Sequence, residues 1–235
     1  MNKLKQFIVF LGVVAINGSA LGTLTLTVSD GLTSSSVTGL NGIVQYFGGF
    51  DGLWNVVIDI GITKPAMGSA SNPVSVLMVQ ADSTSSGGST PANNLVITLS
   101  DNGFGPTDGN VQAILTGHLV YGTGQGVWYN TYYDADNTTG ATTTLLTKLG
   151  PLPGPMYCGT ATGGPVNQTL YSITQVLTIG VNAVNAPGGL YSLNASLSVP
   201  EPLSVPEPTT FVSGALLLLP FGLSTLRKLR QSRAA

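Results

Sequence analysis

Few side chains in this 235-residue sequence are of the types that catalyse reactions. It contains one histidine, His118, and one cysteine, Cys158. A serine nucleophile that works with a histidine often lies in a Gly-x-Ser-x-Gly turn, and no such turn is present. Zinc sites need several histidine or thiolate ligands, so no zinc site is expected. We expect no other cofactor. We expect His118 to be a structural or surface residue. Cys158 cannot form an internal disulfide and is either a half-buried side chain or a thiol that pairs with another molecule.

Carboxylates are the remaining candidates for catalysis, because glycoside hydrolysis needs a pair of them. Eight aspartates are scattered between Asp30 and Asp136, and no glutamate occurs before Glu201. A secreted hydrolase with two aspartates across a cleft is one interpretation, although the commoner glutamate acid is missing. The interpretation we favour is a protein without catalytic residues.

Residues 134–140 have the acidic and amide side chains of a calcium-binding loop. Their glycine comes one place later than in an EF-hand, and Leu145 stands where the bidentate glutamate belongs. The weak candidates for a calcium site of another kind are Asp101, Asp108, Asp134 and Asp136. The alternative, which we favour, is a solvated turn without metal.

An aromatic cluster gives the one indication of ligand binding. In residues 128–133 the alternation of a strand puts Trp128 and Tyr132 on one face, with Tyr129 and Tyr133 on the other. One pair should pack in the core, and the exposed pair would suit the flat face of a sugar. A carbohydrate contact through Trp128 and Tyr132 is therefore predicted as an alternative to ordinary packing on both faces.

Alternation of apolar and polar residues predicts β-strands through the middle of the chain. The runs are 24–28, 54–62, 74–81, 95–99, 111–120, 127–133, 171–181 and 191–199. One face of 54–62 is uniformly apolar, from Trp54 to Ile62, and 74–81 is apolar on both faces, as in a central strand. Residues 83–94 are interpreted as a long loop and 143–149 as a short helix. About nine strands of this kind predict an all-β, antiparallel β-sandwich, with either a jelly-roll or an immunoglobulin-like strand order.

The first 22 residues have the pattern of a secretory signal peptide. Lys3 and Lys5 precede an apolar stretch over 7–16, and small residues follow it. Cleavage is expected after Ala20 or after Gly22. The chain is therefore predicted to leave the cytoplasm through the secretion translocon.

The other end of the chain has three elements in order. The first is the tetrapeptide made of Val205, Pro206, Glu207 and Pro208. The second is an uncharged apolar run over 209–226, which as a helix would be about 27 Å long and would cross the hydrocarbon layer of a bilayer. The third is a basic cluster made of Arg227, Lys228, Arg230 and Arg233. By the positive-inside rule the cluster stays in the cytoplasm and the preceding chain lies outside.

These three elements resemble the PEP-CTERM sorting signal of exported proteins in Gram-negative bacteria. The resemblance covers the last tenth or so of the chain. It implies handling by an exosortase, a membrane enzyme thought to cut at or near the Pro-Glu-Pro triplet. A second copy of the tetrapeptide begins at Val199, so two processing sites are open. A plain C-terminal anchor that is never removed is the alternative.

Charge excludes one class of partner. Between the two terminal segments, two lysines stand against all ten acidic side chains, a formal charge of −8. Phosphate binding needs lysine and arginine, so nucleic acid is not an expected partner. Charged residues make up 8% of the chain, far below the usual quarter, and Gly, Ser, Thr and Asn fill the polar positions.

The sequence therefore predicts an exported protein with four parts. They are a signal peptide (1–22), an exported β-sandwich (23–199), a Pro-rich spacer (200–208) and a transmembrane sorting helix with a basic tail (209–235). The predicted location is the inner membrane before processing, then the cell surface or the extracellular matrix. Extracellular polysaccharide is an expected partner there.

Overall fold

The structure is a computed structural model that describes residues 22–50, 54–83, 93–107, 109–122, 126–180 and 188–200. The chain divides into two compact units, Met1–Pro200 and Glu201–Ala235, and the described residues all belong to the first. The signal peptide (apart from Gly22), the spacer after Pro200, the sorting helix and its basic tail lie outside the described residues. Among the residues described, no helix is both long and apolar enough to span a membrane.

The described residues form twelve strands and no helix. The strands are β1 (Thr25–Ser29), β2 (Ser34–Thr38), β3 (Ile43–Phe50), β4 (Trp54–Ile62), β5 (Val74–Asp82), β6 (Leu95–Phe104), β7 (Val111–Gly122), β8 (Val127–Asp134), β9 (Thr144–Leu152), β10 (Met156–Gly163), β11 (Tyr171–Ile179) and β12 (Gly189–Ser198). They make two six-stranded antiparallel sheets. Sheet A has the order β2-β1-β6-β11-β8-β9, and sheet B has the order β10-β7-β12-β5-β4-β3.

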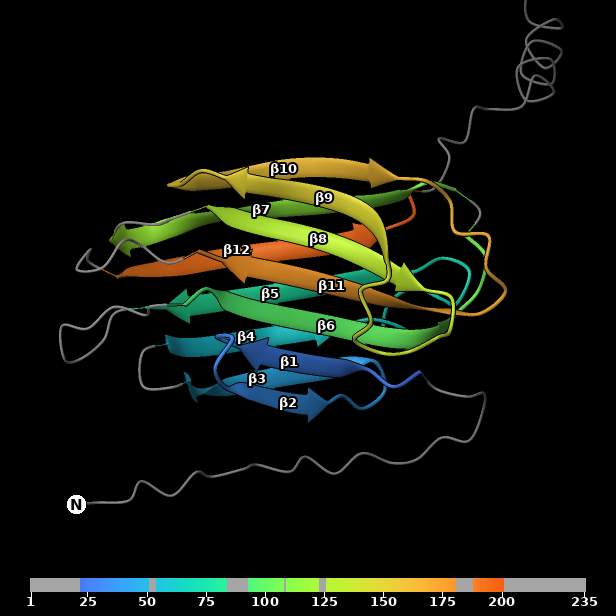
Figure 1. Ribbon diagram of the computed structural model, residues 1–235, viewed down its shortest axis with the longest axis horizontal. Helices are drawn as coiled ribbons and strands as arrows, with labels where there is room; N and C mark the ends of the chain where they lie inside the picture. The colour runs from blue at the N-terminus through green and yellow to red at the C-terminus, as the bar shows by residue number, and fades with distance from the viewer. Residues whose placement is uncertain are drawn as a thin grey trace, which may run out of the picture. The chain divides into compact units, whose positions relative to one another are not determined.

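The two sheets pack face to face as a β-sandwich, with sheet A as the near layer and sheet B as the far layer in Figure 1. The last eight strands follow the order β6-β11-β8-β9 in one sheet and β10-β7-β12-β5 in the other. This is the strand order of a jelly roll, which the sequence could not separate from an immunoglobulin-like order. Strands β1 to β4 extend each sheet by two strands on the same side.

The alternating pattern that predicted the strands also fills the core. On β1, Leu26 and Val28 are fully buried while Thr27 faces out. The same alternation runs along β12, where Leu193 and Leu197 are buried. Apolar side chains from both sheets join in one continuous cluster. The domain therefore has a single core, as the sequence predicted.

Two expectations about individual strands were wrong. Residues 143–149 are not helical, because β9 covers Thr144–Leu152 and pairs with β8. On β4 the apolar face is not continuous: a bulge near Ile60 shifts the alternation, so Gly61 turns inward and Ile62 is only half-buried. Strand β5 is central, as predicted, although its outer face is open at Met78, which is 41% exposed.

A chain of polar side chains crosses the apolar core. The hydroxyl of Tyr129 on β8 donates to Oε1 of Gln175 on β11, and Nε2 of Gln175 donates to Oγ of Ser75 on β5. All three side chains are buried. Burial raises the pKa of the Tyr129 hydroxyl well above its ordinary value, so this group stays protonated as a donor. These two hydrogen bonds link sheet A to sheet B at one fixed register.

A second buried polar group lies at the end of β6. Lys64 Nζ is 3.3 Å from Asp101 Oδ2, and both side chains are nearly buried. The same ammonium donates to the main-chain oxygen of Asn102 and lies 4.4 Å from the centre of the Phe104 ring. Asp101 Oδ2 also accepts from Thr63 Oγ1 at 2.9 Å. A buried ion pair of this kind fixes position more than it adds stability, but losing one partner is costly.

Removing the side chain of Gln175, which links Tyr129 to Ser75 in the core, should destabilise the domain clearly. Gln175→Ala leaves the hydroxyls of Tyr129 and Ser75 without their partner in an apolar interior, at a cost of about 2–4 kcal/mol. The exposed Ser36→Ala is the control and should change stability by less than about 0.5 kcal/mol. Urea denaturation of the purified variants measures both. Equal urea midpoints for the two variants would show that the hydrogen bonds of Gln175 contribute nothing to the stability of the domain.

Candidate functional site

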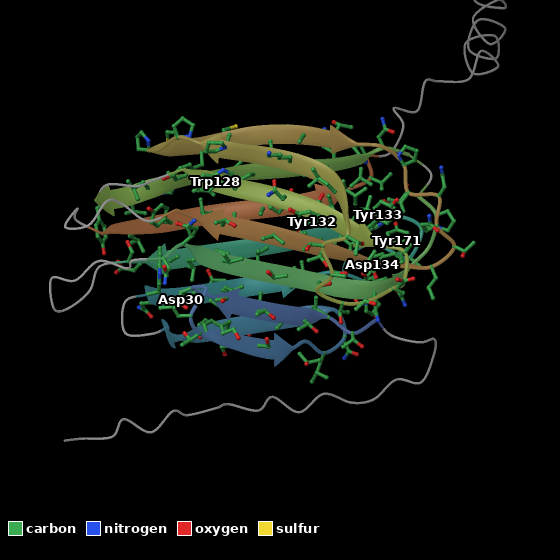
Figure 2. The ribbon with its side chains drawn as sticks, viewed as in Figure 1. Asp30, Trp128, Tyr132, Tyr133, Asp134 and Tyr171 are labelled. Carbon is green, nitrogen blue, oxygen red and sulfur yellow. The ribbon has the colours of Figure 1, made fainter. Side chains whose placement is uncertain are left out.

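The two aromatic residues proposed for carbohydrate contact lie on the outer face of sheet A. Strand β8, which carries them, lies between β11 and β9. Trp128 and Tyr132 (Figure 2) are both half-buried and face outward. Tyr129, between them in sequence, is fully buried in the core. Tyr133 turns inward and meets Tyr171 edge-on, with ring centres 6.1 Å apart. The outward-facing pair is thus Trp128 and Tyr132.

Glycines leave room for the Trp128 ring. A Cβ atom at Gly126 would come within 3.5 Å of its Cη2, and a Cβ at Gly150 would come within 3.2 Å of its Cδ1. Asn130 separates Trp128 from Tyr132 on the same face of the strand. Four residues along a strand span roughly 13 Å, so the two rings could contact separate units of a chain that runs along β8.

The carboxylate of Asp134 acts as a staple for the loop after β8. It accepts a hydrogen bond from Thr138 N at 3.0 Å and one from Thr143 Oγ1 at 2.8 Å. These donors hold the pKa of Asp134 below its ordinary value, the Thr138 amide contributing most. The loop continues with Asn137 at a φ of 59°, whose Oδ1 accepts from Gly103 N. Hydrogen bonds within the protein therefore account for Asp134 and Asn137, two of the residues that resembled a calcium loop.

The remaining calcium candidates do not join Asp134. Asp136 is exposed, Asp101 is paired with Lys64, and Asp108 lies outside the described residues. Within the part of the chain that the structure describes, no three His, Cys, Asp or Glu side chains gather closely enough to hold a metal ion.

Sequence reasoning missed a second carboxylate staple, at Asp30 after β1. Its Oδ1 accepts from Leu32 N at 2.9 Å and from Thr33 N at 2.8 Å. The Thr33 amide is the main cause of a lowered pKa at Asp30. The signal was present as Asp30-Gly31, a typical turn sequence between two strands.

Sheet B, the far layer of Figure 1, carries a groove on its outer face. The groove has a volume of about 210 Å³ and runs over β7, β12, β5 and β4. Its polar side chains are Asp59, Gln80, Thr116, His118, Ser192 and Asn194. Sequence reasoning did not assemble this groove, although it placed Ser192 and Asn194 on the polar face of the last strand.

The register of the strands arranges these side chains in two rows. His118 lies opposite Ser192, which lies opposite Gln80. Thr116, Asn194 and Met78 form the neighbouring row in the same way. Met156 and Ser192 flank His118 on the adjacent strands, so neither direct neighbour is a carboxylate that could orient the imidazole as a general base.

Cys158 is exposed on β10, an edge strand, opposite Thr116. The expectation of a half-buried side chain is therefore wrong, because the outer face of this edge strand leaves the thiol exposed, and its pairing with another molecule stays a prediction.

Comparison with known protein families and with curated proteins found no match to this chain.

The two carboxylate staples should make the domain sensitive to acid. A depressed folded-state pKa adds stability above the ordinary pKa of 3.8, and this stability is lost as the pH falls through the folded-state value. The double variant Asp30→Asn/Asp134→Asn should therefore lose stability at neutral pH and depend less on pH below 3.8. The exposed Asp136→Asn is the matched control. Denaturation midpoints at several pH values test this, and an unchanged acid slope in the double variant would contradict it.

Proposed function

We propose that this chain is an exported, non-catalytic protein of the cell surface or extracellular matrix, sorted and processed through its PEP-CTERM-like tail. The observation that carries the proposal is the order of three elements after residue 204: the Pro-Glu-Pro triplet, the uncharged apolar run and the basic cluster. An exosortase acts on the tail, and the inner membrane holds the protein only until that step. The secretory pattern of the first 22 residues supports the same route.

The attachment of the tail supports an anchoring role. The last strand, β12, ends at Ser198, just before the first Val-Pro-Glu-Pro copy. It lies inside sheet B and pairs along nearly its whole length with β5 on one side and β7 on the other. A tail that leaves from an interior strand passes any pull to two neighbouring strands at once.

The composition of the outer surface supports an extracellular location. The outer face of sheet A is lined by hydroxyl side chains, which include Thr25, Thr27, Ser29, Ser34, Ser36, Thr38, Thr98 and Thr178. Thr27 Oγ1 and Ser36 Oγ are 2.8 Å apart on that face. Among the described residues, Lys64 with Asp101 makes the one ion pair. Hydration by neutral groups changes little with ionic strength, which suits a protein whose surroundings vary in salt.

A second candidate function is carbohydrate binding through Trp128 and Tyr132. The observation that favours it is the position of both rings, half-exposed on one outer face with glycines beside Trp128. Aromatic rings in such a position offer a flat apolar surface and, in tyrosine, a hydroxyl.

Processing should remove the apolar run in the native host. Mass spectrometry of the surface-located protein should find no peptide from residues 209–235, because the exosortase step separates them from the domain. Glu207→Ala should block this removal, whereas Glu201→Ala, the matched change in the other copy, should not. Surface protein that always retains 209–235 would contradict the processing step, and a periplasmic reporter fused after Ala235 would contradict the orientation.

Binding through the aromatic pair predicts a specific loss. On a glycan array, any signal that depends on this face should disappear in Trp128→Ala. Thr178→Ala, which changes the residue opposite Trp128 on β11, should leave the signal in place. An unchanged signal in Trp128→Ala would remove the aromatic pair as the contact.

A further inference from the structure

We propose that the groove on the outer face of sheet B binds an uncharged polysaccharide chain, which lies across the strands from His118 toward Phe47. The proposal rests on the proposed function in one respect, since polysaccharide is what an exported matrix protein meets. The site itself is separate from the aromatic pair on sheet A, and its argument depends on side chains of sheet B alone.

The side chains of the groove match the hydrogen bonding of sugars. Gln80 and Asn194 each carry a donor and an acceptor, and the same holds for the hydroxyls of Thr116 and Ser192 and for a neutral His118. A sugar hydroxyl is also both donor and acceptor. Met78 is 41% exposed in the second row and offers an apolar wall to the C–H face of a ring.

The row that begins at His118 continues beyond the groove to an aromatic ring. Gln80 lies opposite Val57 on β4, and Val57 lies opposite Phe47 on β3. Residues directly opposite each other in an antiparallel ladder share a face, so Phe47 lies on the groove side of sheet B, where it is 62% exposed. The row crosses four gaps between strands, roughly 19 Å at ~4.8 Å per gap. That length fits an extended chain with an aromatic stacking position at its end.

The shape of the groove favours a chain over a small molecule. Its volume of about 210 Å³ is below the roughly 300–1,000 Å³ of pockets that enclose small ligands. The side chains of Thr116, His118 and Asn194 are exposed, so the groove is open along its length. An open groove can hold part of a chain while the rest continues past it.

Charge and backbone pairing exclude the other chain-like partners. Asp59 is the one Asp, Glu, Lys or Arg in the lining, and it would repel an anionic polymer. The described lysines are elsewhere, Lys64 in its ion pair with Asp101 and Lys148 on β9 of the other sheet. A peptide strand would pair with the main chain of a sheet edge. The groove lies over β7, β12, β5 and β4, which are all interior strands whose main chains already pair on both sides.

Affinity electrophoresis tests the proposal with the full-length protein in a polyoxyethylene detergent, which contains no sugar. Gels contain a neutral polysaccharide (dextran, glucomannan or mixed-linkage glucan) or the anionic polygalacturonate. We expect at least one neutral polymer to retard the protein and polygalacturonate to have no effect. Gln80→Ala/Asn194→Ala should weaken the retardation about tenfold or more, and Phe47→Ala should weaken it several-fold.

The controls separate this proposal from the others. Thr27→Ala/Thr98→Ala changes two hydroxyls on the outer face of sheet A and should bind like the unaltered protein. The side chains of Phe47, Gln80 and Asn194 are exposed, and circular dichroism checks that each variant is folded. Retardation by no neutral polymer, or mainly by polygalacturonate, would overturn the proposal. Loss in Trp128→Ala with full binding in Gln80→Ala/Asn194→Ala would overturn it in favour of the aromatic pair. None of these results depends on export or processing, so the sorting proposal stands or falls separately.

Discussion

The structure depends on one constraint: each sheet has one largely apolar face, and the two sheets must bury those faces against each other. The inner faces are therefore apolar almost throughout, from Leu26 on β1 to Leu197 on β12. The polar groups that enter the core are paired, as in the hydrogen bonds from Tyr129 to Gln175 and from Gln175 to Ser75. These hydrogen bonds can form in one strand register only. A slip of one residue would turn Gln175 outward and leave Ser75 without its donor. Apolar burial supplies the driving force, and the polar chain selects the alignment.

The same constraint explains which strands the sequence predicted. The eight runs that were found correspond to the interior strands of the two sheets, and the four that were missed are the edges: β2, β9, β10 and β3. An edge strand has fewer neighbours and a weaker need for an apolar face. Ser34–Thr38 is nearly all hydroxyl, and Thr144–Leu152 spaces its leucines in a way that also fits a helix. Alternation of apolar and polar residues reflects burial of one face, so it is weaker in strands that bury less of their surface.

The two candidate surfaces differ in how far local sequence could reveal them. Trp128 and Tyr132 share one strand, and the period of two is enough to put them on one face. The groove instead takes side chains from β4, β5, β7 and β12, and their order in the sheet is set by crossovers far apart in the chain. Polar alternation did mark Ser192 and Asn194 as outward-facing. What sequence could not supply was that His118 and Gln80 lie on either side of Ser192, because long-range pairing decides this. The role of Asp134 also could not be read from the sequence. Whether its carboxylate binds a metal or its own loop depends on where the Thr138 amide and the Thr143 hydroxyl point, and only the structure shows this.

Strand β12 connects the two proposals mechanically. It supplies Ser192 and Asn194 to the middle of the groove and then leads directly to the doubled Val-Pro-Glu-Pro sequence. A polysaccharide held across the strands would pull on several strands of sheet B, whereas a tail held in the membrane would pull along β12 alone. Because β12 pairs with β5 and β7 over nearly its whole length, a pull along it is opposed by two full ladders of hydrogen bonds together. The end strands β10 and β3 have a ladder on one side only within the described residues, so a tail leaving from either would peel away more easily. If both proposals hold, an interior strand at this position would let the domain bind a matrix while its C-terminal end is still held in the membrane.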